Sequence, residues 1–117
     1  MNTPEETIEY LNTFTGRKYR MIKSNLNKVK TLVKEGYTYQ DIKEVIEIKT
    51  LEWLNNPKMS QYLNPTTLFR LSNFDKYVNQ VIAVKENKEQ YKKYYEEINR
   101  KTSTSGSASS AVDDMFA

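Results

Sequence analysis

The sequence contains no cysteine and no histidine, and only three glycines and three prolines among its 117 residues. Without cysteine, the chain can form no disulfide framework, no thiolate nucleophile and no zinc ribbon. Without histidine, it also lacks the commonest general base and metal ligand of proteins. We therefore expect a protein that is not an enzyme and that needs no metal or cofactor.

The acidic residues and the glycines offer no replacement for the missing groups. Glu96 and Glu97 are neighbours on a helical segment, and Asp113 and Asp114 lie in a low-complexity tail. Neither pair would be held rigidly enough for acid–base chemistry or for Mg²⁺. The glycines, at positions 16, 36 and 106, fit no phosphate-binding loop.

Long apolar runs are also missing. No stretch approaches the roughly 18 apolar residues that a membrane-spanning helix requires. The N-terminal "MNTPEETIEY" is acidic, unlike a signal or transit peptide. We therefore expect a cytoplasmic protein without membrane contact, and a chain of this length can form one small core.

Helix caps and apolar spacing predict an all-α fold, a small single-domain helical bundle. Pro4 suits the first turn of a helix that ends by Gly16. Ser24 is a candidate N-cap for a second helix, which Gly36 would end in a C′ position. Thr38 would cap a third helix directly afterwards, so the helices around Gly36 are expected to form a tight pair that resembles a helix-turn-helix.

The second half of the chain is predicted to be helical as well. "NNPK" interrupts the chain, Asn64 and Pro65 restart a helix, and Ser72 opens a long C-terminal helix that reaches about Arg100. We assign residues 1–84 to the helical domain and 85–101 to an extension of the long helix. Residues 102–117 are expected to form a disordered tail rich in Ser, Gly and Ala.

Three segments carry a family resemblance: "IEYLNTFTGRKYR", "LVKEGYTYQDIKEVIEIKTLEWL" and "YLNPTTLFRLSNFDKYVNQ". They resemble, in order and spacing, the conserved phage C-terminal domain found at the end of DnaD-like phage replisome-organiser proteins. The resemblance covers about residues 8–80. It implies a replication accessory domain of a phage or mobile element in a Gram-positive host, and it names no catalytic residues. Where the family has a basic residue, a proline and an acidic residue, this sequence has Asn64, Pro65 and Thr66. The usual N-terminal winged-helix part is also not expected here. Both departures favour a partner subunit over a protein that recognises an origin by itself.

Most residues of these motifs are predicted to be structural. Trp53 shares one face of its helix with Ile42, Val45 and Ile46, and we expect it to pack in the core rather than to stack on bases. The opposite face carries Asp41, Glu44 and Glu52, with Glu47 at the margin. Phosphates would repel that face, so this helix is not expected to lie in the major groove.

The basic residues of the preceding helix are segregated instead. Lys23, Asn27, Lys30 and Lys34 recur at spacings of four, three and four, which places them in one line on a helix. A loop with three further cations and a tyrosine precedes them, and the tyrosine could stack on a base. A merely solvated basic face is the alternative. The predicted DNA-binding residues are Arg17, Lys18, Tyr19, Arg20, Lys23, Asn27, Lys30 and Lys34.

The C-terminal segments are candidates for binding a protein. Aromatic and aliphatic residues recur along the long helix at alternating spacings of three and four, with one interruption at Lys88. The second half of this helix would meet a partner protein or a second copy, unless it simply frays in solvent. The tail ends in "VDDMFA", which resembles the tail tips of single-stranded-DNA-binding proteins. The predicted partner-binding residues are Tyr91, Tyr94, Tyr95, Ile98, Asp113, Asp114, Met115 and Phe116.

Together, these patterns predict a DNA-replication accessory protein of a phage or mobile element. It would bind DNA through the basic surface and dock on a replication enzyme such as a helicase, a helicase loader or a polymerase or primase. The alternative is a protein-interaction adaptor, or an inhibitor of host replication, that does not contact DNA. Whether the DNA is single or double stranded stays open.

Overall fold

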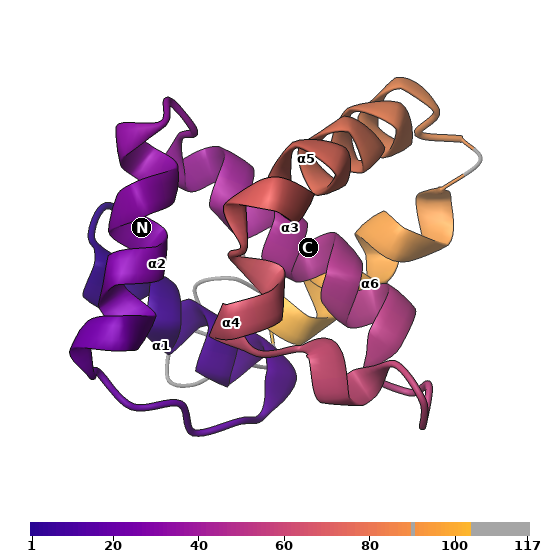
Figure 1. Cartoon of the computed structure of the whole chain (residues 1–117). Coiled ribbons are helices and arrows are strands. Elements are labelled where there is room, and N and C mark those ends of the chain that lie inside the picture. Colours follow the sequence, from indigo (N-terminus) through magenta and orange to yellow (C-terminus); the bar gives the residue numbers. More distant parts are fainter. Residues whose placement is uncertain (90, 104–117) are drawn as a thin grey trace.

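The regular elements of the chain are helices (Figure 1), as described by a computed structural model for residues 1–89 and 91–103. The expected all-α small domain is confirmed. The elements are α1 (Pro4–Thr15), α2 (Lys23–Lys34), α3 (Tyr39–Trp53), the short 3-10 helix η1 (Ser60–Tyr62), α4 (Pro65–Leu68), α5 (Leu71–Glu86) and α6 (Lys92–Ser103).

Helix α3 runs through the middle of the molecule and organises the other helices (Figure 1). Helices α1, α5 and α6 all pack on α3, while α2 packs on α1 and α4. The apolar face of each helix turns toward this centre, because burying it removes the most apolar surface from water. Of the residues predicted on the core face of the third helix, Ile42, Val45 and Ile46 are buried. The other buried apolar side chains include Ile8, Leu11, Phe14, Val29, Leu32, Leu68, Phe69 and Phe74.

The helix ends follow the sequence signals at most positions. Thr38 forms a reciprocal capping box with Asp41 at the start of α3. Gly36 has a φ of 108°, and the amides around it close a Schellman motif at the end of α2. Two predicted starts are wrong, because the N-cap of α2 is Ile22 rather than Ser24, and α5 begins at Leu71 rather than at Ser72.

Helices α2 and α3 were expected to form a tight pair, but they pack on each other only slightly. The two helices are joined by the short turn at Gly36, but α1 lies against both of them and takes the larger share of their packing. Tyr37 in this turn contacts α5, because its ring packs edge-on against Phe74 at 4.9 Å. The pair therefore does not present α3 as an exposed recognition helix.

The expected single long C-terminal helix is wrong. Helix α5 ends at Glu86, and α6 begins at Lys92 and packs back on α3. A continuous helix would leave Tyr91, Tyr95 and Ile98 beyond the edge of the core and in water. Folding back half-buries these three side chains against the core, which is favourable for apolar surface. Residues 92–103 are thus a separate helix of the bundle.

The central position of α3 requires its charged side chains to find partners inside the fold. Lys49 is only 7% exposed, and its Nζ donates to Glu52 Oε1 and to Gln80 Oε1, both at 2.8 Å. Gln80 Nε2 in turn donates to Glu52 Oε2 at 2.6 Å, so this network joins α3 to α5. The same Nζ lies 4.5 Å from the ring centre of Trp53 and 4.7 Å from that of Tyr77.

Glu47 has a single hydrogen-bonding partner among the described residues. The hydroxyl of Tyr10 on α1 donates to Glu47 Oε2 at 2.5 Å. Burial raises the pKa of Glu47, and the hydrogen bond from Tyr10 and the charge of Lys43 partly offset this increase. Burial also raises the pKa of the Tyr10 hydroxyl, which therefore stays protonated and remains a donor.

We predict that Tyr10→Phe lowers the free energy of unfolding by about 1.5–3 kcal/mol at neutral pH, because it leaves a buried carboxylate without its donor. The folded pKa of Glu47 lies above its ordinary value of 4.5. Stability therefore falls as the pH rises from 4.5 through the folded pKa, and the variant raises that pKa further. Urea denaturation at neutral and at acidic pH measures the effect, which should shrink once Glu47 is protonated.

Glu47→Gln is the matched control for this prediction. The amide oxygen can still accept from Tyr10 but carries no charge, so this variant should lose the pH dependence that Glu47 contributes. An equal loss of stability for Tyr10→Phe at both pH values would mean that the charge of Glu47 does not need this hydrogen bond.

Candidate nucleic-acid interface

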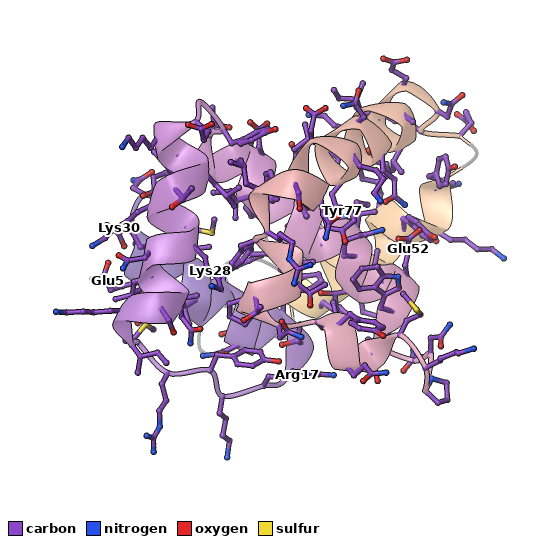
Figure 2. All side chains as sticks on the ribbon, viewed as in Figure 1. Glu5, Arg17, Lys28, Lys30, Glu52 and Tyr77 are labelled. Carbon is purple, nitrogen blue, oxygen red and sulfur yellow. The ribbon has the colours of Figure 1, made fainter. Side chains whose placement is uncertain are left out.

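Four side chains of α2 form the basic stripe: Lys23, Asn27, Lys30 and Lys34. All four are exposed, whereas Val29 and Leu32 on the inner face of the same helix are fully buried. Figure 2 shows Lys30 pointing outward from α2 at the edge of the molecule. The fold therefore arranges the stripe as a continuous surface along one side of the bundle, as the helical spacing predicted.

The charge of this region differs from that of the rest of the chain. Residues 17–34 contain seven basic residues and no acidic one, while the net charge of the whole protein is only +3. The remainder of the chain is therefore net negative. Among the residues that the structure describes, none of these seven cations forms an ion pair. Their charge is not neutralised within the fold and is available to an anionic partner.

The loop before α2, residues 17–22, holds Tyr19 in a structural position. The Tyr19 hydroxyl donates to the carbonyl of Leu63 at 2.7 Å. Its backbone amide donates to Asn12 Oδ1 at 2.7 Å, and its carbonyl accepts from Asn12 Nδ2. Arg17 lies beside it, with Nη1 3.5 Å from the Tyr19 hydroxyl. Because its ring also packs against the core, Tyr19 anchors the loop and is poorly placed to stack on a base.

The same loop exposes two apolar residues that the sequence reasoning missed. Met21 is 41% exposed and Ile22 is 50% exposed, and they lie between Arg20 and Lys23. The sequence does contain a signal for them. They form an apolar pair within a basic segment, and they do not belong to the apolar repeat of a predicted helix. Their side chains offer apolar contact next to cations, the role that Tyr19 was expected to fill.

A groove between α2 and α4 adds two cations on the side of α2 that faces away from the basic stripe. Its volume is about 230 Å³, and its lining includes Lys28 from α2 and Arg70 from the start of α5. Figure 2 shows Lys28 on the side of α2 that is turned toward α4. The other lining residues are Thr31, Thr66, Phe69 and Leu71, so no carboxylate lines this groove.

Comparison with known proteins places the chain among phage sequences. A family model described as "conserved phage C-terminus" matches residues 7–79, which is well over half of the chain. The chain belongs to this conserved phage C-terminus family. The match confirms the resemblance predicted for about residues 8–80. No curated protein and no solved structure matches the chain.

The residues that match the conserved phage C-terminus family extend from α1 into α5. They include the basic stripe, the loop at residues 17–22 and both cations of the groove. They exclude the last turns of α5 and all of α6. Every basic residue proposed here for DNA contact thus belongs to the family domain.

The predicted partner-binding residues fall into two groups, of which the structure describes only the first. Tyr91, Tyr94, Tyr95 and Ile98 are partly buried against the core, so they are not the open anchors that a free helix would present. The tip residues Asp113, Asp114, Met115 and Phe116 lie outside the described residues.

The described part of the chain also bears on metal binding and on membrane insertion. These residues contain no group of three or more Asp, Glu, Cys or His side chains that could hold a metal ion. None of the helices there is both long enough and apolar enough to cross a bilayer.

Tyr19→Phe should lower the free energy of unfolding by about 0.5–1.5 kcal/mol, because it removes the hydrogen bond to Leu63. It should leave nucleic-acid affinity nearly unchanged once the variant is folded. Tyr95→Phe is the matched control, since the Tyr95 hydroxyl is buried and has no hydrogen-bond partner among the described residues. Removing it should leave stability unchanged or slightly higher, and thermal denaturation of both variants measures the contrast. A Tyr19→Phe protein as stable as the wild type would refute the anchoring role.

Proposed function

We propose that this protein is a cytoplasmic accessory factor of phage DNA replication that binds DNA through the basic stripe and the loop at residues 17–22. The observation that carries the proposal is the set of seven cations in residues 17–34, which form no ion pair among the described residues of an otherwise net-negative chain. Lys and Arg side chains at spacings along a helix suit the phosphates of a nucleic-acid backbone.

Binding through this surface is expected to be largely independent of base sequence. Helix α3 would be the recognition helix of a helix-turn-helix, but its side chains are engaged with α1, α5 and α6. The basic stripe carries three lysines, whose compact charges suit phosphate contacts, and such contacts carry no sequence information. Affinity should therefore come mainly from the release of counterions.

Apolar and groove residues would complement the phosphate contacts. Met21 and Ile22 are exposed beside the cations and can contact sugars or bases. Lys28 and Arg70 can hold a further phosphate in the groove between α2 and α4. These contacts would extend the interface around α2 without help from Tyr19.

The family supports a phage protein, and the link to replication rests on the resemblance to DnaD-like organiser proteins. A domain of that kind would work beside a helicase, a helicase loader or a polymerase or primase. The competing function, an adaptor or inhibitor without DNA contact, drew its support from a free tyrosine-rich helix. Because Tyr91, Tyr94 and Tyr95 pack on the core, that support is weaker than the support for DNA binding.

Changing Lys23, Lys30 and Lys34 together to Glu should abolish DNA binding at low salt, because three phosphate contacts become repulsive. Helicity should be retained, since all three side chains are exposed. The new charge at the start of α2 is favourable for the helix dipole and the one at its end is unfavourable, so the two effects nearly cancel. Circular dichroism and fluorescence anisotropy with labelled duplex and single-stranded oligonucleotides measure both properties.

A matched control makes the same change of charge elsewhere. Lys58, Lys76 and Lys93 are exposed and form no ion pair among the described residues, so reversing them gives the same net charge. This control should keep most of the affinity. Equal losses in the two triple variants would show that only the net charge matters, and unchanged affinity of the stripe variant would refute the proposed surface.

Lys28→Ala combined with Arg70→Ala should weaken DNA binding less than the stripe variant does. The slope of log affinity against log salt should fall by about 0.9 for each phosphate that the variant no longer binds on duplex DNA, or about 0.7 on a single strand. Anisotropy titrations at several salt concentrations measure this slope. A slope identical to that of the wild type would exclude the groove from the interface.

A further inference from the structure

Helices α5 and α6 carry one apolar seam although they are separate helices. In α5 this seam consists of Phe74, Tyr77, Val81 and Val84, which are buried against α3. The spacing of three and four continues through Lys88 and Tyr91 into Tyr95 and Ile98 of α6. Both halves of the seam therefore face the same central helix, and the pattern is that of a single uninterrupted helix.

The residues between the two helices do not contain a helix breaker. The segment 87–91 reads "NKEQY", with no glycine and no proline, and Lys, Glu and Gln are good helix formers. The Tyr91 amide already donates to the carbonyl of Asn87 at 3.1 Å, which is the spacing of an α-helical turn. The break at Asn87 thus comes from the docking of α6 on α3 rather than from the local sequence.

The docking of α6 is modest and depends on α3 and α1. Tyr91, Tyr94, Tyr95 and Ile98 are only partly buried, and none of them belongs to the fully buried core. Lys101 lies above the Phe14 ring of α1, 5.6 Å from its centre. Helix α6 packs mainly on α3 rather than on α5, its neighbour in the chain (Figure 1). Straightening the chain between α5 and α6 would therefore disturb little packing between these two helices.

We propose that α6 is exchanged between two copies of this chain, which gives a domain-swapped dimer. In the dimer, residues 71–103 of each copy form one long helix, and its α6 half docks on α3 of the other copy. This inference goes beyond DNA binding and does not depend on it. A swapped dimer would place two basic stripes on one assembly and so let it hold DNA at two places.

A second copy of the chain is the partner whose helix best fits the α3 surface that α6 covers. The α6 of a second copy can make every contact that α6 makes within its own chain. These contacts include the tyrosines on α3 and Lys101 above the Phe14 ring. The straightened helix would continue the helical hydrogen bonding that the Tyr91 amide begins with Asn87, which offsets part of the entropic cost of association.

Changing the length of the connection between α5 and α6 tests the exchange in the full chain. Deleting residues 87–90 leaves one residue between the helices, too few for α6 to return to its own α3. The deletion keeps the seam in register, because Val84 and Tyr91 become three positions apart. Inserting Gly-Ser-Gly-Ser after Glu89 has the opposite effect, since it eases closure and interrupts the long helix.

Light scattering after size exclusion measures the mass of each variant. The deletion variant should run mainly as a dimer, at twice the 13.8 kDa of the chain. The wild type should show a dimer fraction that grows with concentration, and the insertion should remove that fraction. A folded, monomeric deletion variant would overturn the proposal. If the deletion variant does not fold, a wild-type dimer fraction that is absent, or that the insertion leaves unchanged, overturns it equally.

Two single substitutions in the deletion variant identify the surface that holds the dimer. Ile98→Asp places a charge in the α6 seam and should return the protein to monomers. Ile82→Asp is the control, because Ile82 is 46% exposed on α5 and lies outside the seam. The swapped dimer should tolerate it. Loss of the dimer with Ile82→Asp but not with Ile98→Asp would indicate an ordinary surface contact and refute the exchange.

Discussion

The packing of this protein is governed by the buried charged side chains of its central helix, each of which requires a partner inside the fold. Helix α3 is surrounded by α1, α5 and α6, yet it carries Glu47 and Lys49 at nearly full burial. A buried charge without a partner is strongly destabilising, so each of these side chains fixes a neighbour. Tyr10 ties α1 to Glu47, and Gln80 ties α5 to Lys49 and Glu52. Figure 2 shows Glu52 and Tyr77 on the facing sides of α3 and α5.

This constraint separates the charges of the molecule into two groups. The acidic residues of α3 are used largely inside the fold, as when Glu44 pairs with Lys85 of α5 at 3.0 Å. The lysines of α2 have no such task and remain at the surface. A helix that is committed to internal partners cannot read base edges, whereas a helix with exposed cations can hold phosphates. The separation therefore favours backbone binding over recognition of a base sequence.

The same central helix also explains the behaviour of the C-terminal region. The family domain supplies a face of α3 that α1 and α5 leave open, and α6, which lies outside the matched residues, covers it. Because α6 is joined to α5 by a segment that could itself be helical, its position is decided by docking on α3. A weakly buried element with a helix-compatible connection is well suited to exchange between copies.

The local features of this protein can be read from its amino-acid sequence. The capping box at Thr38, the left-handed turn at Gly36 and the exposed line from Lys23 to Lys34 depend on residues within a few positions of one another. Their positions follow from helix geometry alone, and the family motifs were equally legible. Only the tertiary structure decided the features that link distant residues. It fixed Tyr19 to Leu63 across 44 positions, and it folded α6 back on α3. No local pattern encodes either contact, because each depends on which surfaces remain uncovered once the other helices have packed.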